Sequence, residues 1–375
     1  MQILESVARI LLIVAGFYIV ANVVLSALKT FALPRSANVR LTRWTFRGIR
    51  WIFNLRTKKA RSYEERDKIM ALYAPISLFV LPIVWIAGVI SGYTLIYSGL
   101  GLDVYSAFRT SGSSMLTLGF FVSEGTGMLV LEFSQAALGM LLVALLMAYL
   151  PTMYSAFSRR ESAVSLLEVR AGSPPSPAEM LIRLHQIQGL ERLHAMAEQW
   201  EIWFVELEES HTSLSALVFF RSPKPNNSWI TAAGTMLDAG ALMVSTVDRP
   251  DDPQVHLMIR AGYIALRSIA DFFEIPYDPN PKPDDVISIA REEFDQVYDQ
   301  LIEAGVPVKP DRDQAWRDYA GWRVNYDRVL LVLAELTFAP YAMWISDRGL
   351  PHTADTVYKK GLSRRSTLAV MSGGR

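Results

Sequence analysis

The sequence lacks cysteine altogether and carries few charged residues. Without cysteine a chain has no disulfide, no thiolate zinc site and no thiol nucleophile. Charged residues make up 20% of the chain, below the roughly 25% that soluble domains carry. Formal net charge is zero, so the charge balance gives no reason to expect a nucleic-acid partner, and we expect none.

Motifs of catalysis and cofactor binding are also missing from the sequence. No G-x-G-x-x-G follows a predicted strand, and no alternation of apolar and polar residues predicts a sheet. Two Glu-x-x-His pairs, Glu191 with His194 and Glu208 with His211, have the spacing of di-iron ligands. On one helix, however, the pairs would lie about 25 Å apart. We interpret them as solvated side chains, and we expect an all-α protein without enzymatic activity, metal site or cofactor.

Apolar residues, by contrast, are abundant, at 51% of the chain, and they concentrate before residue 155. Three runs, 10–28, 69–100 and 128–154, are long enough to cross a bilayer as helices. The first run could instead be a cleaved signal peptide. Against that alternative, only one basic residue, Arg9, precedes it and no small-residue cleavage site closes it. In the second run, Gly88 and Gly92 have the spacing that lets another helix approach closely.

A strongly basic segment, 35–68, separates the first two runs and predicts their orientation. Loops rich in lysine and arginine stay in the cytoplasm. We therefore expect a multi-pass protein of the cell inner membrane, with its N-terminus outside and its C-terminal domain cytoplasmic. Aromatic residues such as Trp44 and Trp51 alternate with the basic ones, which predicts an amphipathic helix on the anionic inner leaflet. Nucleic-acid binding is the alternative interpretation of such a stretch.

Four parts follow from this pattern. They are an N-terminal span with its basic loop (1–68), a two-span core (69–160), a cytoplasmic α-helical domain (161–349) and a flexible tail (350–375). Helices are expected in the domain at about 176–210, 228–247, 253–273, 284–304 and 312–346. The apolar runs 229–247 and 329–345 contain Asp238 and Glu335, so we interpret them as buried helices. The alternative is a second pair of spans.

The segment between the second and third runs is unusual for its position. Residues 109–121 read RTSGSSMLTLGFF, rich in small and hydroxyl side chains. Asp103 can cap a short helix that runs to about Ser114, and few residues then remain before the next run. Non-helical backbone at membrane depth survives only where protein buries it or where it lines water. The pattern therefore predicts a re-entrant loop and favours a pore lining.

This arrangement resembles the bacterial potassium-channel-like family of pore-loop ion channels. TLGF, at 117–120, is similar to the Thr-Val-Gly-Tyr core of potassium-channel pore loops, and span, pore helix, filter and span follow in the same order over about 70–160. The continuation YLPTMYSAFSRRE also looks like this family. The resemblance implies a homotetrameric channel that passes a monovalent cation, K⁺ above all. It assigns the selectivity filter to Thr117, Leu118, Gly119 and Phe120, and the pore helix and outer mouth to Asp103, Ser113, Ser114, Phe121 and Glu124.

Two positions depart from the family pattern. Phe121 occupies the place of the second filter glycine, and the acidic residue that usually follows is replaced, with Glu124 nearby. A bulky residue resists the positive φ that glycine allows there. The alternative function is therefore a non-conducting membrane sensor or scaffold that keeps the fold with a degenerate filter.

Overall fold

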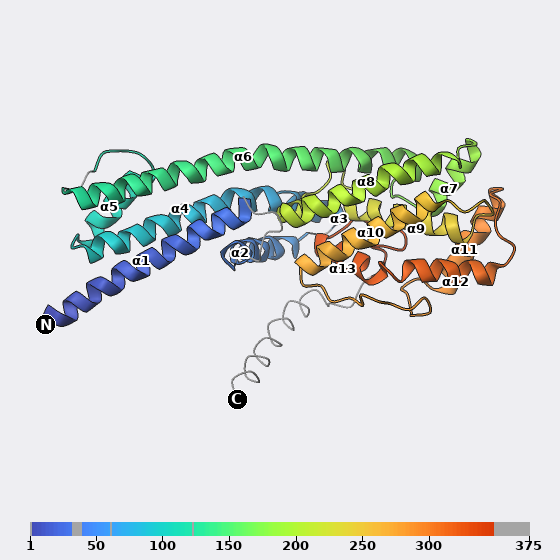
Figure 1. Cartoon of the computed structure of the whole chain (residues 1–375). Helices are drawn as coiled ribbons and strands as arrows, with labels where there is room; N and C mark the ends of the chain where they lie inside the picture. Colours follow the sequence, from blue (N-terminus) through green and yellow to red (C-terminus); the bar gives the residue numbers. More distant parts are fainter. Residues whose placement is uncertain (1, 32–39, 61, 122–123, 349–375) are drawn as a thin grey trace, which may run out of the picture. The chain divides into compact units, whose positions relative to one another are not determined.

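The computed structural model describes residues 2–31, 40–60, 62–121 and 124–348 (Figure 1). Regular structure in these ranges is helical, apart from one isolated antiparallel bridge between Val247 and Val308. The tail at 350–375 and residues 35–39 of the basic loop lie outside the described residues. By its internal contacts the chain forms two compact units, unit 1 (1–155 with 213–220) and unit 2 (156–212 with 221–375). The division into four parts stays a prediction.

Unit 1 contains the apolar helices. Three helical stretches are long and apolar enough to cross a membrane, and they indicate a membrane protein: Ile3–Thr30, Tyr63–Gly99 and Thr126–Ala171. They confirm the three predicted runs as helices, and the third continues well beyond residue 154. The elements of the unit, in chain order, are α1 (Gln2–Phe31), α2 (Arg40–Thr57), α3 (Tyr63–Ala71), α4 (Tyr73–Gly99), α5 (Val104–Met115), the first part of α6 (Thr126–Ala171) and the 3₁₀ turn η1 (Ser215–Phe219).

Glycines let α1 and α4 pack against each other at very short range. The two helices lie side by side (Figure 1). A Cβ built on Gly92 would lie 2.6 Å from Cγ2 of Val20 and 3.0 Å from the carbonyl oxygen of Gly16, and one on Gly88 would lie 2.7 Å from Val23. Such distances leave no room for a side chain. The predicted close approach at Gly88 and Gly92 is confirmed, with α1 as the partner helix.

Tyr73, at the start of α4, joins α2 to the rest of unit 1. Its ring packs edge-on against Phe53 of α2 and Phe219 of η1, with centroids 5.8 and 5.5 Å away. Helix α2 has the predicted amphipathic character, because Ile49 and Phe53 are buried on one side. Trp44 lies on the other side of the same helix and is 72% exposed.

Unit 2 is built around a buried helix, α9, which contacts several of its neighbours in the unit. Fifteen of its residues are buried, although the helix contains the acidic Asp238. The apolar run 229–247 is thus a buried helix, as predicted. Besides the end of α6, the helices of the unit are α7 (Pro177–Gln186), α8 (Arg192–Ser213), α9 (Trp229–Ser245), α10 (Pro253–Phe272), α11 (Arg291–Glu303), α12 (Arg312–Arg323) and α13 (Asp327–Thr337).

Asp238 is tolerated inside α9 because α12 and the turn after it supply partners. Arg323 donates to both carboxylate oxygens, at 2.8 and 2.6 Å, and the hydroxyls of Tyr319 and Tyr326 donate at 3.1 and 2.8 Å. Arg323 and Asp238 are fully buried. A second carboxylate, that of Asp327, accepts from Arg323 at 2.8 Å. The pair meets the general rule that a buried charge must be both paired and hydrogen-bonded.

Three of the predicted helices have different limits. The run 176–210 is wrong as one helix, because the chain breaks between α7 and α8, where Gln188 has φ of 50°. The run 312–346 is also wrong as one helix. It divides into α12 and α13, and Phe338 ends α13 in the left-handed conformation. Helix α11 begins at Arg291, later than the predicted 284.

His211 is buried, so its interpretation as a solvated side chain is wrong. Its Nε2 lies 3.2 Å from Nη1 of Arg160 on α6. Because arginine can only donate, Nε2 must accept and the ring proton must sit on Nδ1, which lies 3.1 Å from the Ser210 hydroxyl. Glu161 pairs with Arg160 at 2.7 Å, and the Trp229 ring lies 4.8 Å from His211. Burial, followed by the charge of Arg160, holds the pKa of His211 well below its usual range.

Replacing Gly92 by alanine should destabilise the protein, because the added Cβ meets Val20 and the Gly16 carbonyl. In a free helix the same change stabilises by about 0.5–1 kcal/mol. The matched control is Gly48→Ala on α2, where a Cβ would meet nothing within 4 Å. We expect the melting temperature of the detergent-solubilised protein to fall for Gly92→Ala and to hold or rise for Gly48→Ala. Equal melting temperatures for the two variants would contradict the close packing of α1 and α4.

Acidification should destabilise the protein through His211. The pKa of His211 is depressed in the fold, so below about pH 6.5 the unfolded chain binds a proton that the folded chain does not. The free energy of unfolding therefore keeps its full contribution from His211 above that pH. Below it, that free energy falls by up to about 1.4 kcal/mol per pH unit. His211→Gln should flatten the acid side of a melting-temperature profile. An equally steep profile in His211→Gln would show that another group is responsible.

Candidate functional site

The candidate site begins at α5, the short helix between α4 and α6. Asp103 caps it as predicted, because its carboxylate accepts from the backbone N–H groups of Tyr105 and Ser106, both at 3.1 Å. The hydroxyl and the backbone N–H of Ser106 lower the pKa of this carboxyl. The helix ends at Met115, close to the predicted Ser114.

Two contacts show how far α5 extends along its neighbours. The Ser111 hydroxyl donates to the carbonyl of Ile90 at 3.0 Å, and Ile90 lies about 14 Å before the C-terminal end of α4 along its axis. A Cβ on Gly139 of α6 would overlap the carbonyl oxygen of Met115, and Gly139 lies about 20 Å from the start of α6. The C-terminal half of α5 therefore lies beside α4 and α6 at points well away from the nearer end of each helix.

A buried polar network holds α5 in this position. The Gln135 side chain, on α6, donates to the Ser111 hydroxyl at 2.6 Å and accepts from the hydroxyl of Tyr97 on α4 at 3.4 Å. Gln135, Ser111 and Tyr97 are all fully buried. Tyr93 and Ser134 form a second link between α4 and α6, at 2.8 Å. Polar groups buried among apolar helices are tolerated because they satisfy one another.

Beyond α5 the chain turns back against the end of the helix. The Ser113 carbonyl accepts from the backbone N–H of Leu118 at 2.8 Å, and the Ser113 hydroxyl accepts from that of Phe121 at 3.2 Å. The Ser114 carbonyl accepts from Thr117 at 3.1 Å. Both serines are buried. The predicted residues Ser113 and Ser114 thus lie together with the segment 116–121, whereas Asp103 lies at the opposite end of α5.

The backbone of 117–120 alternates in conformation. Thr117 and Gly119 have φ of 54° and 69°, and Leu118 and Phe120 do not have positive φ. A positive φ is uncommon for threonine and costs about 1 kcal/mol or more, whereas glycine accepts it freely. A Cβ on Gly119 would meet nothing within 4 Å. Gly119 is therefore required by its backbone angle in the single chain, not by lack of space.

The same segment is largely exposed in the single chain. Leu116, Leu118 and Phe120 are 50, 56 and 63% exposed, and Thr117 and Gly119 are exposed too. Phe121, the next residue, lies against α5. The Arg109 guanidinium of α5 lies over the Phe121 ring, 4.7 Å from its centroid.

Sequence reasoning missed two residues of this site. Gln135 was overlooked within a long apolar run, although an isolated amide among apolar residues is a signal of a buried hydrogen bond. Arg109 was visible as the cation of the small-residue segment, but nothing in the sequence pairs it with Phe121. Glu124 is exposed at the far end of the segment, and residues 122–123 before it lie outside the described part of the chain.

Comparisons of this chain with known proteins assign it to no family. A scan against models of protein families, a search of curated proteins and a search of solved structures each found no match to this chain. The similarity to potassium-channel pore loops therefore depends on the residues of 70–160 alone and stays a prediction.

Gln135→Leu should loosen α5 without unfolding the protein. The change leaves the Tyr97 and Ser111 hydroxyls without their partner, a loss of about 1–3 kcal/mol. We expect faster hydrogen–deuterium exchange in the amides of α5 and a lower melting temperature. Gln199→Leu, at an exposed position of α8, is the matched control and should change neither. Unchanged exchange in α5 would mean that Gln135 does not hold this helix.

Proposed function

We propose that this protein is the subunit of a pore-loop cation channel, potassium-channel-like, that allows passive flow of monovalent cations across the cell inner membrane. Four copies would surround one axis, with residues 117–120 of each copy facing it. The N-terminus would lie outside and unit 2 in the cytoplasm.

The observation that carries the proposal is the placement of non-helical backbone beside the apolar helices α4 and α6, well away from the nearer end of each helix. Residues 116–120 are exposed in the single chain, and α5 before them ends beside Ile90 and Gly139. Lipid cannot satisfy the peptide groups of such a segment, because each unsatisfied group costs several kcal/mol in hydrocarbon. Water, an ion or another copy of the chain has to cover it. A ring of four copies around a hydrated axis would supply water, an ion and neighbouring copies of the chain.

The chemistry of ion passage fits this backbone. A filter replaces the water shell of an ion with rings of backbone carbonyls, and the chain must adopt unusual dihedral angles to aim successive carbonyls at one axis. Positive φ at Thr117 and Gly119, with Leu118 between them, provides such an alternation. The apolar side chains of Leu118 and Phe120, exposed here, would pack against neighbouring copies.

Helix α2 supports the orientation. It has a basic composition and exposes Trp44 and Trp51, 72 and 65%, while Ile49 and Phe53 face the core of unit 1. Exposed tryptophans with basic residues on one helix are typical of a helix lying at a lipid surface. The helix would lie on the anionic inner leaflet, which places the basic segment inside.

A non-conducting sensor or scaffold is the second candidate, and one contact favours it. Arg109 stacks on Phe121 at the position where the resembling family has its second filter glycine. Four such cations around one axis would repel a cation that approaches from outside.

Cation flux into liposomes decides between the two candidates. Gly119→Ala should abolish flux while the tetramer still assembles, because a side chain at φ of 69° is strained. Gly112→Ala on α5 is the matched control, since it has ordinary helical φ and an added Cβ meets nothing within 4 Å. Phe121→Gly should raise the preference for potassium over sodium.

Three results would count against the channel. Absence of flux in the parent, with assembly intact and at every voltage and pH tried, would favour the scaffold. Flux in Gly119→Ala equal to that of the parent would mean that ions do not pass along 117–120. A purified particle without fourfold symmetry would exclude the arrangement itself.

A further inference from the structure

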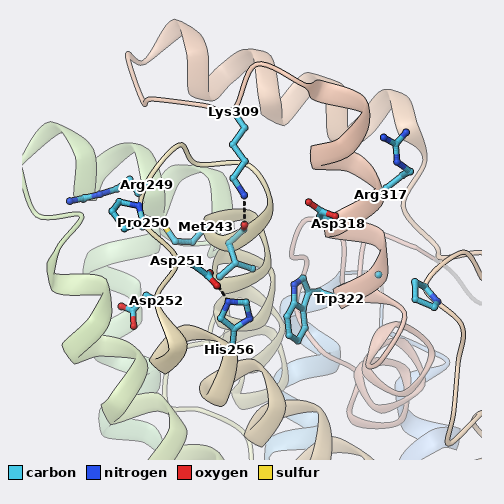
Figure 2. A pocket seen from close by; sticks show the side chains of 13 residues that line it. Met243, Arg249, Pro250, Asp251, Asp252, His256, Lys309, Arg317, Asp318 and Trp322 are labelled. Carbon is cyan, nitrogen blue, oxygen red and sulfur yellow. Dashed lines mark hydrogen bonds and ion pairs between the residues drawn. The ribbon is translucent and has the colours of Figure 1, made fainter.

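Unit 2 contains a pocket that the channel proposal does not use. It has a volume of about 420 Å³ and lies between the loop after α9, the start of α10, α12 and Lys309 (Figure 2). Pockets of about 300–1,000 Å³ are the usual size for small-molecule sites. The lining residues all belong to unit 2.

An aromatic wall forms one side of the pocket. The rings of Trp322 and His256 lie with centroids 5.1 Å apart, and Figure 2 shows them side by side facing the pocket. His256 is held in place, because its Nε2 lies 2.6 Å from the carboxylate of Asp251. The wall therefore offers a fixed aromatic surface for an apolar group or for a cation.

Two opposite charges reach the pocket without an ionic partner. Lys309 is half-buried, and its ammonium donates to the carbonyl of Val244 at 2.7 Å. Within the described residues, no carboxylate lies at ion-pair distance from this ammonium. The carboxylate of Asp318, on α12, accepts from the amide of Gln314 at 2.7 Å and likewise has no cation at ion-pair distance in the described part of the chain. Lys309 and Asp318 enter from different sides, above the two rings (Figure 2).

The other charges of the lining are already engaged or lie on its rim. Arg249 pairs with Glu191 at 2.8 Å, and Asp252 lies 3.0 Å from His194. Arg317 is exposed and bonds to Gln314. With His256 neutral, the lining has no formal net charge, because it has three basic and three acidic side chains. The basic ones are Arg249, Lys309 and Arg317, and the acidic ones are Asp251, Asp252 and Asp318. A polyanion such as a nucleotide would meet as many acids as bases, which does not favour it.

We propose that this pocket binds a small zwitterion of the amino-acid class, with its carboxylate on Lys309 and its ammonium group on Asp318. The ammonium group would also lie over the face of Trp322, an arrangement that attracts cations. Lys309 and Asp318 are half-buried beside an aromatic wall, and neither has an ionic partner among the described residues. Together they match a ligand that carries one positive and one negative charge. Each charge of the ligand replaces water at a group that has no ionic partner in the free protein. The site is independent of ion flux, because it requires only unit 2.

The test is the stabilisation of the full-length protein in detergent by a series of zwitterions with increasing charge spacing. The series is glycine, β-alanine, 4-aminobutanoate and 6-aminohexanoate, extended by L-leucine and L-phenylalanine, each at about 10 mM, a concentration that reveals millimolar affinity. Propanoate and propylamine carry one of the two charges each and serve as matched controls. We expect at least one zwitterion to raise the melting temperature and both single-charge compounds to leave it unchanged.

Variants then assign the binding to the pocket by titration calorimetry. Asp318→Asn keeps the shape of the side chain, and Lys309→Met removes the ammonium group. Each should weaken the best zwitterion by about tenfold or more, as expected for the loss of an ionic contact of about 1.4 kcal/mol. Lys224→Met and Asp299→Asn, at charged surface sites of the same unit outside the pocket, should not change the affinity.

Three outcomes would overturn the proposal. The first is that no zwitterion of the series binds. The second is that the best zwitterion binds Asp318→Asn as tightly as the parent. The third is that inorganic phosphate or adenosine triphosphate binds more tightly than any zwitterion. The comparison of zwitterions with single-charge compounds needs no variant, so it remains decisive if Lys309→Met fails to fold.

Discussion

The need to satisfy peptide groups in apolar surroundings is the constraint on which unit 1 depends. Helices α1, α4 and α6 meet it internally, because each N–H bonds within its own helix. The chain after Met115 cannot, and it relies on Ser113, which accepts through both its carbonyl and its hydroxyl. Ser113 is itself held by α5, which Gln135 and Ser111 fasten to α6. A few buried polar side chains thus support a non-helical segment beside α4 and α6, and one face of that segment is exposed in the single chain.

In unit 2, a buried carboxylate has the same need for hydrogen-bond partners. Helix α9 is apolar enough to be mistaken for a span, yet Asp238 sits at its centre and is fully buried. Arg323 and two tyrosine hydroxyls surround its carboxylate, so α12 is fixed against α9 by bonds that break only together. Removing one partner from such a pair costs about 3–5 kcal/mol. Asp238, which makes α9 costly to insert into a membrane, is therefore also the residue that bonds this helix to its neighbours in the unit.

Features set by local sequence were predictable, and features set by distant contacts were not. The apolar runs, the Asp103 cap and the close approach at Gly88 and Gly92 follow from patterns within one helix. The break between α7 and α8 depends on a left-handed Gln188, and no proline marks it in the sequence. His211 was misinterpreted because its partner, Arg160, lies on a different helix. In the candidate site, the serines were predicted, whereas Gln135 and the stacking of Arg109 on Phe121 are visible only once α5, α6 and the segment between them are folded.

Helix α6 is one of the three places where the chain passes from one unit to the other, between Ser155 and Ala156. It continues from Thr126 to Ala171 through the division between the units. Pro151 lies shortly before that division and cannot donate to the carbonyl one turn earlier, so the helix is weakest in bending there. Just beyond, Arg160 is clamped by Glu161 and His211 within unit 2. The flexibility of α6 is therefore concentrated at Pro151, whereas the stretch around Arg160 is fixed by its partners within unit 2.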